Sequence, residues 1–147
     1  MIRVHVNASE PGAVPVAILE RAVRTALAAE GVSDGEISLT LLGDDGIRAM
    51  NREYLDADRP TDVIAFALHD PEEPVLGDVY LGLAQAARQA RDAGVGLDEE
   101  LVRLAVHGTL HVLGWDHPGD EGREESEMYR VQERLVRRVL DHAAESG

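Results

Sequence analysis

The chain has 147 residues, of which 44% are hydrophobic, enough for one domain with a moderate core. Its 28 acidic and 14 basic residues give a formal net charge of −14, which argues against a protein that coats nucleic acid through a basic surface. It has no cysteine, no apolar run of about 18 residues and no signal-peptide stretch, so we expect a cytoplasmic protein without thiolate metal sites, disulfides or a membrane span.

The first two elements are a strand and a helix. Residues 2–7 alternate between apolar and polar side chains, which is typical of a strand. Pro15 stands near the expected start of a helix, and Gly31 is the expected stop. The helix is predicted from an apolar stripe at helical spacing, formed by Val16, Leu19, Val23, Ala26 and Leu27.

A second strand and a short helix follow. Residues 36–42 predict the strand. Asp44 or Asp45 is then expected to cap a helix over roughly 46–54. The inward side chains of this helix are predicted to be Ile47 and Met50.

Two further strands surround a short connection. Residues 55–62 are polar and read as a loop, and 63–67 predict a strand. After an irregular segment over 69–75, residues 76–82 predict another strand. Two strands joined by a short polar loop most simply form an antiparallel hairpin.

The second half of the chain is predicted to be helical. One helix covers 83–93 and ends near Gly94, and a second begins at the acidic run from Asp98 and continues to 112. A last helix spans about 120–143. We therefore expect an α+β domain, a four-stranded mixed sheet packed with about five helices. The apolar face of the last helix is predicted to contain Met128, Val131, Leu135, Val136, Val139 and Leu140.

Residues 107–117 read HGTLHVLGWDH and carry the main functional pattern of the chain. His107 and His111 are four residues apart, so on a helix they lie on one face, one turn apart. Gly114 can end the helix in the left-handed conformation, after which the chain can bring His117 to the same point. Three imidazoles without a fourth protein ligand describe a catalytic zinc site with an open position, so we expect one Zn²⁺ per chain. The other histidines, expected on a strand, a loop or the surface, are His5, His69 and His142.

The residue after the first histidine separates two classes of hydrolase. Long zinc-protease motifs share this histidine spacing but carry a glutamate there as general base. Gly108 cannot accept a proton, so a metallopeptidase is disfavoured. A zinc on three neutral imidazoles keeps its positive charge, can lower the pKa of bound water towards ~7, and suits an anionic phosphodiester. Asp116 either orients a ligand histidine and acts as a base, or caps the turn after the helix.

The histidine motif resembles that of the YbeY family, the bacterial endoribonucleases of ribosomal-RNA maturation. Supporting motifs stand in the family's order, and the likeness covers roughly residues 38–128. They are Asn51-x-x-Tyr54, Thr61-Asp62-Val63-Ile64-x-Phe66, Leu76-Gly77-Asp78-Val79 and Met128.

The resemblance implies a zinc-dependent, single-strand-specific endoribonuclease whose single domain spans residues 1–147. It implies one zinc on His107, His111 and His117, a site whose histidine spacing is metzincin-like. Asp116, beside His117, is the candidate catalytic residue from its position in the sequence. The resemblance also implies roles in the 3′-end maturation of small-subunit rRNA and in ribosome quality control. The implied partners are single-stranded RNA and small-subunit components, with no membrane. A non-catalytic, zinc-containing ribosome-assembly factor is the main alternative.

Position 55 departs from the family pattern. Many members carry an arginine linked to RNA cleavage directly after the tyrosine of Asn-x-x-Tyr, and here the residue is Leu55. Arg52 or Arg59 either contacts a phosphate instead or is a surface residue. Asp78 is expected to cap a turn beside a strand end, and the role of Asp62, in the cleft or in a turn, stays open.

Overall fold

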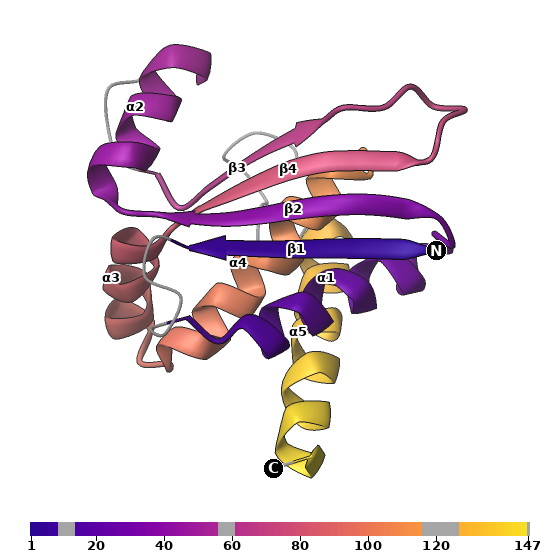
Figure 1. Cartoon of the computed structure of the whole chain (residues 1–147). Coiled ribbons are helices and arrows are strands. Elements are labelled where there is room, and N and C mark those ends of the chain that lie inside the picture. The colour runs from indigo at the N-terminus through magenta and orange to yellow at the C-terminus, as the bar shows by residue number, and fades with distance from the viewer. Residues whose placement is uncertain (9–13, 56–60, 116–126, 147) are drawn as a thin grey trace.

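Strands and helices alternate through the first half of the chain, and helices fill the second. The computed structural model describes residues 1–8, 14–55, 61–115 and 127–146 (Figure 1). The elements in these segments confirm the predicted α+β fold with four strands and five helices. In order they are β1 (Ile2–Ala8), α1 (Val16–Ala29), β2 (Gly35–Leu42), α2 (Asp44–Leu55), β3 (Val63–Ala67), β4 (Val75–Gly82), α3 (Leu83–Ala93), α4 (Leu97–Val112) and α5 (Glu127–Ser146).

The four strands form one mixed sheet in the order β1-β2-β4-β3. β1 and β2 are parallel, and so are β2 and β4. β3 runs antiparallel to β4, with Val63 opposite Leu81 and Ala67 opposite Gly77. The predicted hairpin is therefore confirmed, and both β1 and β3 are edge strands.

One face of the sheet is covered by helices. Figure 1 shows α1, α4 and α5 gathered on one side of the strands, while α2 stands near their ends. Alternation along the strands turns residues such as Leu39 and Val79, both fully buried, towards these helices. α4 is buried along most of its length, which explains why its sequence is apolar on several sides. None of the helices in the described part of the chain has the length and hydrophobicity of a membrane-spanning segment.

Gly114 ends the helix that carries the first two histidines, as predicted. Its φ is 95°, in the left-handed region that favours glycine. Its N–H donates to the carbonyl oxygen of His111, and the N–H of Trp115 donates to that of Leu110. This pair of bonds is a Schellman motif, which turns the chain away directly after α4. Gly31 and Gly94 also have positive φ, 77° and 71°, at the ends of α1 and α3.

Four expectations about local structure need correction. Val16 is 39% exposed rather than inward, since it lies in the first turn of α1. Asp44 belongs to the first turn of α2 instead of preceding it as a cap, and both of its carboxylate oxygens accept hydrogen bonds from Arg88. Asp78 lies within β4 and not beside a strand end. The last helix continues to Ser146, and its predicted start at 120 is outside the described residues.

Candidate metal centre

His107 and His111 face one another on α4, as their spacing predicts. Their Nε2 atoms are 2.9 Å apart. The ring centroids are separated by 4.5 Å and the ring planes meet at 78°. His107 is only 7% exposed and His111 is half-buried, so the pair lies at the margin of the core.

The donor atoms of this pair suit a zinc ion. Zinc binds imidazole nitrogen at about 2.0–2.1 Å, and two nitrogens 2.9 Å apart can both lie at that distance from one ion. His117 and Asp116 are outside the described residues. Within residues 1–8, 14–55, 61–115 and 127–146, no three acidic or histidine side chains gather as a metal-binding group. The described part therefore supplies two of the three expected ligands.

Gln132, on α5, is a polar neighbour that the sequence analysis missed. Its Oε1 atom lies 2.6 Å from Nδ1 of His107, and the residue is 5% exposed. A signal was available, because Gln132 falls four residues after the buried Met128, on the inward side of an otherwise apolar stripe. A buried polar side chain on such a stripe needs a partner, and here the partner is a candidate metal ligand.

A network of charged side chains on α4 and α5 reaches Gln132 through its neighbour Glu133. Arg103 of α4 donates to both carboxylate oxygens of Glu133, over 2.9 and 3.0 Å, and also to Glu99 and Glu100. The hydrogen bonds that Arg103 donates to Glu133 raise the pKa of its guanidinium, although burial opposes them. Burial would raise the pKa of Glu133, but hydrogen bonds from Arg103 and Gln132 outweigh it and the pKa is lowered. The ion pairs tie α4 to α5 beside the histidines.

Glycine at position 108 allows α4 to approach the sheet closely. A Cβ atom there would lie 2.5 Å from Cγ1 of Val79 and 3.2 Å from Cγ2 of Val63. Gly77 on β4 makes a similar approach to Val112. The close packing gives a structural reason for a small residue after His107. It is separate from the observation that glycine cannot act as the general base that zinc proteases carry at this position.

The other histidines lie away from this pair. His5 on β1 pairs with Glu36 over 3.1 Å. His69 follows β3 and contacts the backbone of Leu76, and His142 is exposed on α5. These positions agree with the expected strand, loop and surface placements.

Of the remaining candidates, Asp62 lies beside β3 and Arg52 lies on α2. Asp62 is half-buried just before β3, and its carbonyl oxygen accepts a hydrogen bond from the N–H of Gly82. Arg52 is exposed in the last turn of α2, which ends at Leu55. Arg59 is outside the described residues.

Three aromatic rings form a row on the face of the sheet opposite α4. Phe66 and Tyr80 alternate with the residues that face α4, and α2 adds Tyr54 to them. Tyr54 and Phe66 have centroids 5.4 Å apart, and Phe66 and Tyr80 6.1 Å apart, both edge to face. Tyr54 is 57% exposed. Burial, and then the charge of Asp78, raises the pKa of the Tyr80 hydroxyl.

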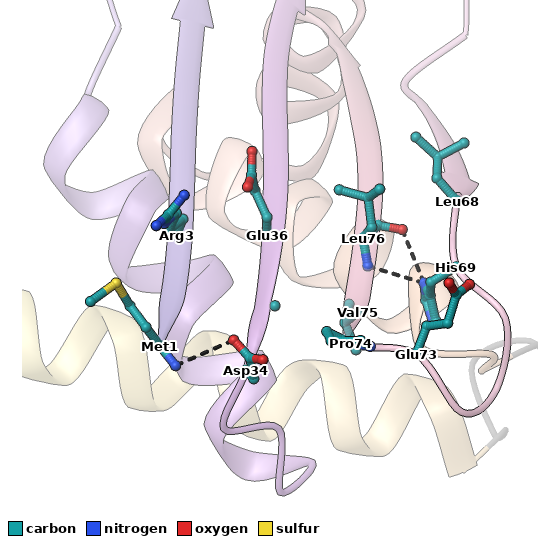
Figure 2. Close-up of a pocket in the computed structure, with 11 residues that line it drawn as sticks. Met1, Arg3, Asp34, Glu36, Leu68, His69, Glu73, Pro74, Val75 and Leu76 are labelled. Carbon is teal, nitrogen blue, oxygen red and sulfur yellow. Dashed lines mark hydrogen bonds and ion pairs between the residues drawn. The ribbon is translucent and has the colours of Figure 1, made fainter.

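A surface hollow of about 430 Å³ lies on this same outer face (Figure 2). It lies at the starting ends of β1, β2 and β4, where Arg3, Glu36 and Leu76 are in register. Asp34 and Glu73 add two further carboxylates, and Asp34 pairs with the amino group of Met1. The carboxylates disfavour a phosphate there, and the hollow is separate from the histidine pair.

Comparisons with known proteins agree on one family. The family model described as "Endoribonuclease YbeY" matches residues 7–140. A protein of Bacillus licheniformis named Endoribonuclease YbeY is 41% identical over 144 residues, covering 88% of this chain and 90% of its own. Proteins of the same name from Geobacter sulfurreducens and Moorella thermoacetica are 40% and 44% identical, covering 84% and 74% of this chain and 85% and 78% of their own.

A solved structure has the same fold. The solution structure of TM1509 from Thermotoga maritima matches with a TM-score of 0.68. The match covers 97% of this chain and 93% of that one, at 23% sequence identity. At that identity the likeness concerns the fold alone.

Proposed function

The chain belongs to the endoribonuclease YbeY family, and on that basis we propose that it is a zinc-dependent endoribonuclease that cuts single-stranded RNA. The proposed role is the 3′-end maturation of small-subunit rRNA and ribosome quality control, in the cytoplasm and in contact with small-subunit components. The observation that carries the chemistry is the pair of Nε2 atoms of His107 and His111, 2.9 Å apart on a buried helix.

His107 and His111 would hold the ion, together with His117 as the third ligand. A zinc ion bound by neutral imidazoles supplies positive charge that polarises a phosphoryl oxygen and lowers the pKa of water. The burial of His107 supports this role, because a rigid ligand keeps its lone pair aimed at one point. Asp116 is the proposed base or orienting group, next to His117 in the sequence.

Tyr54 is the proposed contact for unpaired bases. Proteins bind single-stranded RNA by stacking its bases on aromatic rings, and Tyr54 is exposed at the end of the aromatic row with Phe66 and Tyr80. Arg52, two residues away on α2, is exposed and can contact a phosphate. Stacking on an aromatic ring does not require positive charge, so it can contribute to RNA binding by a chain whose net charge is −14.

Cleavage by purified protein tests the activity. Zinc-loaded wild type is expected to cut an unstructured RNA and to leave a duplex of the same sequence intact. His111→Ala is expected to abolish cutting, whereas His142→Ala, which changes an exposed histidine of α5, is expected to cut like the wild type. Equal cutting by His111→Ala would identify a contaminating nuclease and contradict the proposal.

The second candidate is a non-catalytic assembly factor whose zinc supports the fold. Leu55 favours it, because the family arginine linked to RNA cleavage is missing at that position. This candidate predicts that zinc removal unfolds the domain and that the metal-loaded protein associates with small subunits without cutting RNA. Metal analysis of the purified protein, combined with the cleavage assay and co-sedimentation with small subunits, separates the two.

A further inference from the structure

We infer that Gln132 is a positioning residue that holds His107 in the tautomer able to bind a metal through Nε2. The inference rests on the proposed metal site and adds to it a residue of α5, 25 positions away in the sequence. It follows from the direction of hydrogen bonds around the amide of Gln132.

The contact between Gln132 and His107 has one possible direction. An amide oxygen can only accept a hydrogen bond, so Nδ1 of His107 carries the proton and donates it over 2.6 Å to Oε1 of Gln132. In a neutral imidazole the other nitrogen then carries a lone pair and no proton. That nitrogen, Nε2, faces Nε2 of His111 at 2.9 Å.

The orientation of the amide is itself determined by its neighbours. Nε2 of Gln132 donates to Oε2 of Glu133 over 3.1 Å, so a flipped amide would set its oxygen against a carboxylate. Glu133 is held in place by Arg103, which donates to both of its oxygens. Arg103 is also bound by Glu99 and Glu100 of its own helix. The amide oxygen of Gln132 is therefore kept towards His107.

If Gln132 positions His107, then removing the acceptor of Gln132 should change the tautomer of the His107 ring even in metal-free protein. Outer hydrogen bonds fix the tautomer and the ring direction of metal-binding histidines, and losing one typically weakens metal affinity 10- to 100-fold. Gln132→Met keeps the size of the side chain and removes the acceptor. Gln132→Glu keeps an acceptor in the same place. Gln89→Met is the matched control, since Gln89 is a part-buried amide whose Nε2 donates to Glu100.

The first measurement is the protonation pattern of the ring of His107 in metal-free protein, from long-range ¹H–¹⁵N correlation spectra. The wild type, Gln132→Glu and Gln89→Met are expected to carry the proton on Nδ1. Gln132→Met is expected to show a mixture or the Nε2-protonated form. If Gln132→Met does not fold, Gln132→Asn, whose shorter side chain withdraws the acceptor, takes its place. An unchanged Nδ1–H form in these variants would overturn the inference.

The second measurement is zinc affinity by competition with a chelator. Gln132→Met is expected to bind zinc about 10- to 100-fold more weakly than the wild type, and Gln132→Glu and Gln89→Met within about threefold of it. Equal affinity in Gln132→Met and the wild type would overturn the inference. If the wild type itself binds no zinc, the proposed function fails, and the tautomer measurement still decides whether Gln132 orients His107.

Discussion

Gly108 on α4 lies so close to Val79 on β4 that a Cβ atom at position 108 would come within 2.5 Å of Cγ1 of Val79. Real Cβ contacts essentially never reach such a distance, so with a larger residue either the side chain of Val79 or the helix must shift. A shift of the helix would move His107, the residue that precedes Gly108 in the chain. The first prediction follows from this contact.

Gly108→Ala is expected to destabilise the protein. Overpacking a core typically costs about 1–3 kcal/mol, which over most of that range exceeds the roughly 1 kcal/mol that alanine contributes to a helix over glycine. Urea unfolding measures the change. The double variant Gly108→Ala/Val79→Ala is expected to lose less than the sum of the two single variants, because the second change makes room for the new methyl group. Additive losses would show that the two residues do not compete for the same space.

Zinc is expected to stabilise the metal-free protein. A ligand present at a hundred times its dissociation constant stabilises the folded state by about 2.7 kcal/mol, which corresponds to a rise in Tm of roughly 5–10 °C for a domain of this size. Thermal unfolding with and without zinc measures the shift. His111→Ala is expected to lose most of it, and His142→Ala to retain it. A shift of equal size in all three proteins would place the stabilising zinc elsewhere.

Acid is expected to weaken the link between α4 and α5. The pKa of Glu133 is below its ordinary value of 4.5, because hydrogen bonds from Arg103 and Gln132 outweigh the opposing effect of burial. With a lowered folded-state pKa, the unfolded chain takes up the proton first. The stabilisation is therefore complete well above pH 4.5 and is lost as the pH falls through 4.5 towards the folded-state pKa.

Glu133→Gln tests this pH dependence. At neutral pH it is expected to be less stable than the wild type by about 1–2 kcal/mol, since hydrogen bonds to a charged, partly exposed group are lost. Between about pH 5 and pH 3 its free energy of unfolding should fall less steeply than that of the wild type, so the two curves converge. Urea unfolding over this range gives both curves. In an Arg103→Met background the same substitution should leave the slope nearly unchanged, and parallel wild-type and Glu133→Gln curves would contradict the assignment.

Tyr54 is expected to contribute to RNA binding. Removing an aromatic ring that stacks on a base typically costs about 1–3 kcal/mol, so Tyr54→Ala should weaken binding of unstructured RNA by about tenfold or more. Fluorescence anisotropy with a labelled oligonucleotide measures the affinity. Leu68→Ala is the control, because Leu68 is also exposed, at 51%, but lines the acidic hollow. Equal affinities of Tyr54→Ala and the wild type would remove Tyr54 from the RNA surface.

Local patterns in the sequence are enough to predict the strands and to place the first two histidines on one helical face. The strands predicted at 2–7, 36–42 and 76–82 differ from β1, β2 and β4 by one residue at one end, and 63–67 coincides with β3. These features are local, because a period of two side chains defines a strand and an offset of four places His107 and His111 on one helical face. The left-handed turn at Gly114 is equally local, since it depends on a residue without a Cβ atom.

The surroundings of the histidines, in contrast, depend on how distant segments of the chain pack together. Gln132 meets His107 because α5 packs along α4, and no periodicity within either helix specifies that contact across 25 residues. The close approach at Gly108 and the pairing of Asp44 with Arg88, 44 residues apart, have the same origin. Such contacts depend on which helix and sheet surfaces pack together, and packing is a property of the whole chain rather than of a short segment.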